Sequence, residues 1–245
     1  MVAVTDTNCR KGCHGTLCQD RKRYGLQDRR IDLCLTKVEE KRKITDMDQS
    51  YENTRLDELI QDVVESGATE LAVVSTQGII IDDHLANKCR EPRCENFGTS
   101  INCPPHVAGP AALRKQLEKF TRAIFFRIDV PSEILYSSEY LEWFRLLHEM
   151  AAGIERSAVK RGYADATALA GGSCKKIFCD NHSDCLVLSE KGKCRYPRSA
   201  RPSMSGFGIN VVKLVEAAGW TGSVGHGMGS SATKMAGIYG LVLID

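Results

Sequence analysis

The stretch Ala-Ile-Phe-Phe-Arg-Ile-Asp-Val, residues 123–130, is a strong strand candidate, because most of its residues are β-branched or aromatic. A second strand is predicted over residues 238–244, near the end of the chain. Between them, residues 137–162 predict a long helix with its apolar side chains on one face, and residues 166–170 predict a short strand. These elements alternate between helix and strand, which is typical of an α/β fold.

The N-terminal side of this stretch extends the same pattern. Apolar residues recur at helical spacing from Thr54, which can cap a helix, to Gly67, which can end it. Residues 71–75 and 78–82 are β-rich runs that predict a strand or a hairpin. Further helices are predicted over residues 110–120 and 209–218. We therefore expect a mixed sheet flanked by helices, with two long cysteine-rich inserts that follow strands.

Composition excludes several classes of protein. The chain has eleven cysteines, an odd number that excludes complete disulfide pairing, and a formal net charge of +2, which argues against a dedicated nucleic-acid binder. No apolar run approaches the roughly 18 residues needed to cross a bilayer, and the N-terminus does not read as a signal peptide. We therefore expect a cytoplasmic protein, in which clustered cysteines serve as metal ligands or redox groups.

The strongest cysteine set lies in the second cysteine segment, residues 171–201. Its members are Cys174, Cys179, Cys185 and Cys194, with gaps of four, five and eight residues. Structural zinc usually takes tighter pairs, whereas wider gaps suit the separated corners of a four-iron cluster. The segment also carries seven basic and three acidic residues, a local excess that would stabilise an anionic cluster. The sequence therefore favours an iron–sulfur site here, and the alternatives are zinc and cysteines that are unliganded or disulfide-bonded.

The first cysteine segment, residues 89–106, offers three thiols, Cys89, Cys94 and Cys103, followed by Pro-Pro-His. Three completions are open. His106 could be the fourth ligand, although a surface histidine on a rigid turn is the simpler interpretation. Cys34 could serve instead. The fourth position could also stay open to substrate or water, and an exposed iron is a Lewis acid able to bind substrate.

Two further features are candidates for binding. The N-terminal extension, residues 1–50, is polar and carries four cysteines, which could bind another cluster or zinc: Cys9, Cys13, Cys18 and Cys34. Near the C-terminus, Gly225, His226 and Gly227 lie in a Gly-rich stretch whose backbone amides could approach an anionic cofactor. A plain loop before the last strand is the alternative. His148, in the predicted helix 137–162, is interpreted as a packing residue.

Several motifs together resemble a known family. They are Lys-Cys-Arg-x-Pro-Arg-Cys at residues 88–94, Asn-Cys-Pro-Pro-His at 102–106, Ala-Gly-Gly-Ser-Cys at 170–174, Cys-Arg-Tyr-Pro at 194–197 and Ala-Arg-Pro-Ser-Met at 200–204. The chain resembles, over residues 54–245, a family of uncharacterised predicted metal-binding proteins (domain of unknown function 2284) found mainly in anaerobic bacteria and archaea. The resemblance implies metal or iron–sulfur binding at the seven cysteines of the two segments, and it implies no particular reaction.

A shorter likeness concerns residues 217–222, Ala-Ala-Gly-Trp-Thr-Gly, followed by the Gly-rich stretch and a strand. This part is similar to the cofactor-binding region of cobalamin-dependent epoxyqueuosine reductases and reductive dehalogenases. Those enzymes pair a corrinoid with two four-iron clusters, so the likeness adds a corrinoid to the possible cofactors.

These observations lead to one main interpretation. We expect an N-terminal extension over residues 1–50 and an α/β iron–sulfur cluster-binding domain over residues 51–245. The domain would hold one to three [4Fe–4S] clusters, two being the expected number, and would transfer electrons to or from a partner enzyme or cofactor, without nucleic acid or membrane. The alternatives are an iron–sulfur oxidoreductase with an open cluster at Cys89, Cys94 and Cys103, and a zinc-stabilised binding module.

Overall fold

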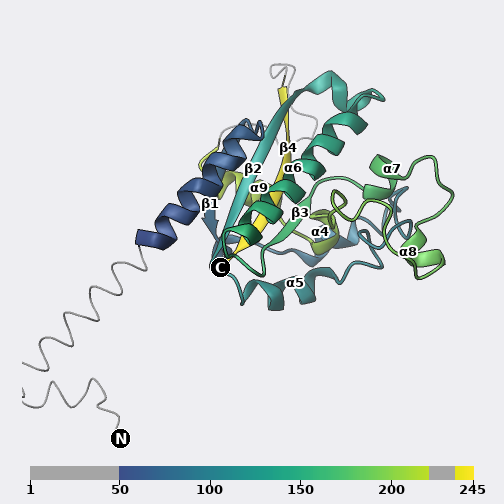
Figure 1. The fold of residues 1–245 in the computed structure, drawn as a ribbon. Helices are drawn as coiled ribbons and strands as arrows, with labels where there is room; N and C mark the ends of the chain where they lie inside the picture. Colours follow the sequence, from purple (N-terminus) through teal and green to yellow (C-terminus); the bar gives the residue numbers. More distant parts are fainter. Residues whose placement is uncertain (1–49, 221–234) are drawn as a thin grey trace, which may run out of the picture. The chain divides into compact units, whose positions relative to one another are not determined.

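The computed structural model describes residues 50–220 and 235–245 (Figure 1). The cysteines predicted as ligands in the N-terminal extension lie outside the described residues, and so does the predicted cofactor loop with Gly225, His226 and Gly227. The chain divides into two compact units, Met1–Leu56 and Asp57–Asp245. The first unit is described only over residues 50–56, which are helical, and the whole sheet belongs to the second unit.

The second unit is built on a four-stranded sheet of β1 (Glu70–Ser75), β2 (Arg122–Pro131), β3 (Thr167–Ala170) and β4 (Met235–Ile244), in the order β1-β2-β4-β3. The strands predicted at residues 123–130 and 238–244 are confirmed and form the centre of the sheet. They pair over ten residues, from Arg122 with Ile244 to Pro131 with Met235. Their nearly continuous apolar sequence follows from burial on both faces of the sheet.

The α/β class is confirmed, and the strand directions refine it. All named strand pairs are antiparallel, whereas a mixed sheet was expected; the described residues contain one parallel contact, an isolated bridge between Ala170 and Ser203. Ser75 and Arg122 are register partners, so the long insert between β1 and β2 leaves and re-enters the sheet at the same end. Such a connection joins antiparallel neighbours, because a parallel pair needs a crossover to the other end.

Helices cover both faces of the sheet. The described helices are residues 50–65, α4 (Asp83–Asn87), α5 (Gly109–Leu117), α6 (Tyr140–Lys160), α7 (Cys174–Phe178), α8 (Leu186–Ser189) and α9 (Val211–Ala217). The helices predicted over residues 110–120, 137–162 and 209–218 are thus confirmed; the last two are shorter at both ends, and α5 begins one residue earlier and ends three residues earlier than predicted. The long helix α6 packs against β3 and β4, and residues of α5 and α9 join a core cluster on the other face, with Phe125 and Leu241.

Two local predictions need correction. Thr54 lies inside the helix of residues 50–65 and does not cap it; its hydroxyl donates to the backbone oxygen of Ser50. The strand predicted at residues 71–75 is confirmed as β1, but the hairpin alternative is wrong: residues 78–82 do not pair with β1, and Ile81 makes only an isolated bridge to Ile209. The reason is that Asp82 caps α4 by accepting a hydrogen bond from the backbone nitrogen of His84, so the chain turns into a helix there.

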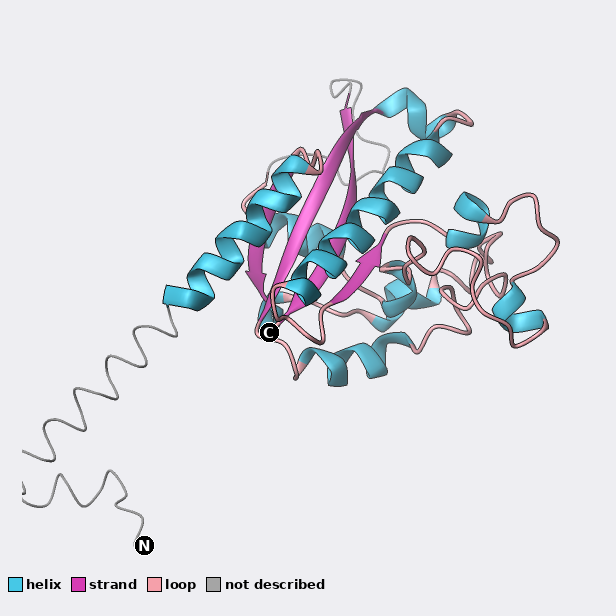
Figure 2. Ribbon diagram, in the orientation of Figure 1, coloured by secondary structure: helices cyan, strands magenta, loops and turns pink. Residues whose placement is uncertain are grey.

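The two cysteine segments leave the sheet from opposite edge strands. The first follows β1 and the second follows β3. Figure 2 shows the loops around α7 and α8 gathered beyond β3, where the short helices are joined by long irregular stretches. Among the helices of the described ranges, none combines the length and the apolar character needed to span a bilayer.

Candidate metal centre

The two cysteine segments meet at residues 102–103 and 173–174. Cys103 Sγ donates to Ser173 Oγ at 3.4 Å, and Asn102 Nδ2 donates to Cys174 Sγ at 3.5 Å. The backbone oxygen of Asn102 also accepts a hydrogen bond of 3.0 Å from the backbone nitrogen of Ser203. Cys103 and Cys174 are both buried, with exposed fractions of 6 % and 8 %. Asn102 of the first segment therefore forms a hydrogen bond with a cysteine sulfur of the second segment.

The second segment brings its four cysteines to one small pocket. Cys174, Cys179, Cys185 and Cys194 all line it, and residues 100–102 of the first segment complete its wall. Cys174 begins α7, Cys179 follows the end of that helix, and Cys185 directly precedes α8. The structure thus brings together the four thiols that the spacing of the sequence grouped.

Hydrogen bonds and basic side chains surround these sulfurs. Besides Asn102, the backbone nitrogen of Tyr196 donates to Cys194 Sγ at 3.4 Å. Lys175 Nζ donates to the backbone oxygens of Cys179 and His182 at 2.8 and 2.7 Å, which closes the loop after α7. Donors and positive charges of this kind stabilise a thiolate or an anionic cluster.

Burial controls the protonation of the thiols. Desolvation raises the pKa of Cys174 to about 11, against the hydrogen bond from Asn102, which lowers it. Burial also raises the pKa of Cys179, and the positive charge of Arg195 opposes that rise. Without metal, these thiols therefore stay protonated at neutral pH, so a bound metal must displace their protons.

The three cysteines of the first segment line a second, larger cavity. Its volume is about 590 Å³, and Cys89, Cys94 and Cys103 all contribute to its lining. Burial raises the pKa of the Cys89 thiol, and the neighbouring Cys94 and Cys103 raise it further. The three thiols therefore share the lining of one cavity. They face a cavity floored by residues 237–239 of β4 and flanked by α6.

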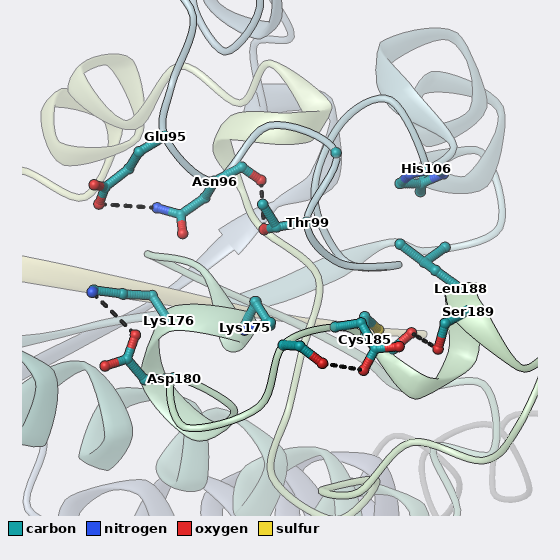
Figure 3. Close-up of a pocket in the computed structure, with 13 residues that line it drawn as sticks. Glu95, Asn96, Thr99, His106, Lys175, Lys176, Asp180, Cys185, Leu188 and Ser189 are labelled. Atoms are coloured by element: carbon teal, nitrogen blue, oxygen red, sulfur yellow. Dashed lines mark hydrogen bonds and ion pairs between the residues drawn. The ribbon is translucent and has the colours of Figure 1, made fainter.

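His106 lies elsewhere. It lines a different cavity, of about 530 Å³, between the first segment and the helices α7 and α8. Among the described residues, it is not part of the wall of the cavity at Cys89. In Figure 3, His106 lies across from Leu188 and Ser189. The structure therefore does not bring His106 to the three thiols whose fourth ligand it could have been, and Cys34 lies outside the described residues.

Residues 50–220 and 235–245 contain no group of three or more His, Cys, Asp or Glu side chains in a geometry that holds one metal ion. The seven cysteines of this part of the chain are all free thiols. The fit to a metal therefore rests on the type of donor atom. The donors are soft sulfur atoms, four in one pocket and three in the other.

His148 is fully buried and supports the backbone around the centre. The backbone nitrogen of Arg201 donates to its Nδ1 at 3.2 Å, so Nε2 carries the proton and donates to the backbone oxygen of Gly171 at 3.0 Å. Desolvation lowers the pKa of His148 to about 4. The neutral ring therefore ties α6 to both ends of the second segment, as expected of a packing residue.

This histidine predicts a pH dependence of stability. The folded pKa of about 4 lies below the ordinary value of 6.5, so the unfolded chain binds the extra proton between these two values. Stability is expected to fall as the pH drops through this window, by a total on the order of 3 kcal/mol. Urea unfolding at a series of pH values should show a flatter profile for His148→Gln, and equal slopes in both proteins would contradict the assignment.

Gly172 allows the second segment to pass close to α6. Its φ is +84°, and a Cβ atom there would lie 2.9 Å from Cδ1 of Phe144. Gly67 has a similar φ of +96° but nothing within 4 Å of such an atom, so it provides a matched control. We expect Gly67→Ala to lower the free energy of unfolding by about 1 kcal/mol and Gly172→Ala by about 2–4 kcal/mol, measured by chemical denaturation. Equal losses would show that the contact with Phe144 carries no cost.

Sequence reasoning missed the polar residues that connect the segments. Asn102, Ser173 and the ion pair of Glu155 with Arg201 carry no spacing signal, because their partners lie 46 to 72 residues away. The available hint was that Asn102, Ser173 and Arg201 all lie within the motifs that carry the family resemblance.

Comparison with known proteins agrees with the chemistry of the two thiol groups. No curated protein and no solved structure matches the chain. A family model described as a predicted metal-binding protein, DUF2284, matches residues 72–244, which include both cysteine segments and the whole sheet except the first two residues of β1. The chain therefore belongs to this family of predicted metal-binding proteins.

Proposed function

We propose that the protein is an iron–sulfur redox protein that holds two [4Fe–4S] clusters and transfers electrons to or from a partner enzyme or cofactor. The observation that carries the proposal is the division of the seven described cysteines between two pockets, four in one and three in the other. Four thiolates match the ligand number of a closed cluster, and three leave one corner for another ligand.

The residues around the four-thiol pocket fit such a group. The sulfurs are buried or half-buried, and Cys174 and Cys194 accept N–H hydrogen bonds, which raise the reduction potential of a cluster. Arg195, Lys175 and the other basic residues of the segment offset the negative charge that four thiolates would bring. A bound [4Fe–4S] cluster would supply one-electron redox chemistry, and these side chains would set its potential.

The contact between the segments supports electron exchange between two sites. Cys103 belongs to the three-thiol group and Cys174 to the four-thiol group. Cys103 Sγ donates to Ser173 Oγ, and Ser173 is joined to Cys174 by one peptide bond. Asn102, the chain neighbour of Cys103, also donates to Cys174 Sγ at 3.5 Å, so two hydrogen bonds connect the two groups. Sites this close would exchange electrons through bonded and hydrogen-bonded atoms.

A second candidate function is an iron–sulfur oxidoreductase whose three-thiol cluster binds substrate. The cavity of about 590 Å³ favours it, because an electron carrier needs no chamber beside its cluster. The separate location of His106 also favours an open fourth position. A corrinoid-linked reaction belongs to this candidate, and co-purification of cobalamin, or a rise of the melting temperature on its addition, tests it.

Metal analysis of anaerobically purified protein tests the proposal as a whole. We expect a brown protein with iron and acid-labile sulfide in equal amounts and little zinc, as [4Fe–4S] clusters require. A colourless protein that contains only zinc would overturn both redox candidates and leave the zinc-stabilised binding module.

A further inference from the structure

The cavity at Cys89, Cys94 and Cys103 has mostly apolar and aromatic walls. Tyr140 and Phe144 of α6 form an edge-to-face pair, with ring centres 6.0 Å apart, on one side. Tyr239 of β4 lies at the floor, and Met204 and Ile238 add further apolar surface. Cavities of this size and character are typical of sites for small organic molecules.

The floor of the cavity is held rigid by a stack of three rings. Tyr239 stacks on Phe125 with ring centres 5.5 Å apart, and Phe125 stacks on Trp220 at 4.8 Å. Arg127 also lies over the ring of Trp220, 5.5 Å from its centre. A wall that is already ordered loses little entropy when a flat ligand packs against it, so the cavity is prepared for binding.

The charged side chains of the lining already have partners. Lys176 Nζ pairs with Asp180 at 3.1 Å, and Glu95 accepts a hydrogen bond from Asn96 at 3.4 Å. The hydroxyls of Ser173, Ser203 and Ser205 add polar groups without charge. A charged ligand would lose its water and would have to displace one of these contacts, whereas an uncharged ligand would not.

We propose that this cavity binds an uncharged, flat aromatic or conjugated molecule, with its body on the aromatic walls and a polar end toward the serine hydroxyls. If the protein is the iron–sulfur oxidoreductase of the second candidate function, its substrate belongs to this class of molecule and binds beside the three-thiol site. The inference deepens that function, but the binding itself depends only on the described cavity.

The test is calorimetry on the full-length, anaerobically purified protein with three probes that share a naphthalene ring and differ in the charge of one substituent. They are 1-naphthol, which is neutral, 1-naphthoate, which is anionic, and 1-naphthylmethylammonium, which is cationic. We expect 1-naphthol to bind at least about tenfold more tightly than either ion. Equal binding of the three probes, or tighter binding of an ion, would overturn the proposal.

Three variants locate the binding. Val211 lines the cavity and the adjacent Val212 is half-exposed on the same helix, so Val211→Trp fills the site and Val212→Trp is its matched control. Ser205 is an exposed residue of the lining, so Ser205→Trp blocks the cavity without disturbing the core. We expect both lining variants to lose 1-naphthol binding by at least about tenfold and the control to keep it. If Val211→Trp does not fold, Ser205→Trp decides, and unchanged binding in that variant overturns the proposal.

Iron and sulfide are measured in the same samples, so that the two proposals fail separately. Iron-loaded protein that does not bind 1-naphthol refutes the cavity proposal and leaves the redox function standing. Protein that binds 1-naphthol but contains no iron refutes the redox function and leaves the cavity proposal standing.

Discussion

Replacement of Glu155 by alanine is expected to lower the free energy of unfolding by about 3–5 kcal/mol, the usual cost of leaving a buried charge without its partner. Arg201 donates to both carboxylate oxygens, at 2.7 and 3.1 Å, and the two side chains are only 20 % and 10 % exposed. The same carboxylate also accepts a hydrogen bond of 2.6 Å from the backbone nitrogen of Ala168 in β3. The pair thus joins α6, an edge strand and the end of the second cysteine segment.

A double-mutant cycle isolates this pair. Arg201→Ala should cost a similar amount, and the double variant should cost much less than the sum of the two single changes, because no unpaired charge remains. Lys213 and Glu216 form an exposed pair on α9, at 2.6 Å, so Glu216→Ala is the control and should change stability by less than about 0.5 kcal/mol. Urea denaturation measures all four variants. Strictly additive losses from Glu155→Ala and Arg201→Ala would contradict the account.

Single cysteine replacements are expected to remove the two proposed clusters separately. Cys94 is exposed and Cys185 is half-buried, so changing them disturbs the core least. If each group of thiols holds one four-iron cluster, Cys94→Ala and Cys185→Ala should each lose up to roughly half of the iron and sulfide, and the double variant should lose nearly all of it. Metal analysis and electron paramagnetic resonance on anaerobic protein measure the loss.

The same series separates the electron carrier from the enzyme. In Cys185→Ala, the remaining spectrum belongs to the three-thiol site, and added small molecules should change it only if one corner of that cluster lacks a protein ligand. A spectrum that stays the same with every added ligand would favour the closed carrier. Cys34→Ala serves as the control for a borrowed ligand, because a loss of iron equal to that of Cys94→Ala would place Cys34 in the same group.

Much of the fold could be predicted because the central strands are nearly continuous apolar runs. Residues 123–130 and 238–244 are buried on both faces, and that burial is visible in the sequence. The run at 78–82 misled because its composition is equally β-rich, and the decisive group is the Asp82 side chain that caps α4. The helical state of residues 50–53 could not be predicted from a threonine at position 54 that fits a cap but bonds within the helix.

The candidate site was partly predictable for a similar reason. Cysteines that share a segment are forced to be near one another, so the spacing of Cys174, Cys179, Cys185 and Cys194 was enough to group them. The approach of Asn102 to Cys174 depends on two inserts from opposite edges of the sheet, and no local pattern encodes it. The placement of His106 across from α8 is likewise set by the tertiary fold.

The position of residues 100–102 determines when the pocket of the second cysteine segment is complete. They form part of the wall around four sulfurs that all belong to the other cysteine segment. A peptide of residues 171–201 would contain every thiol of that group and still lack part of its enclosure. The four-sulfur pocket is therefore complete only when the loop after β1 has docked, so a metal bound there would stabilise the docking of the two loops.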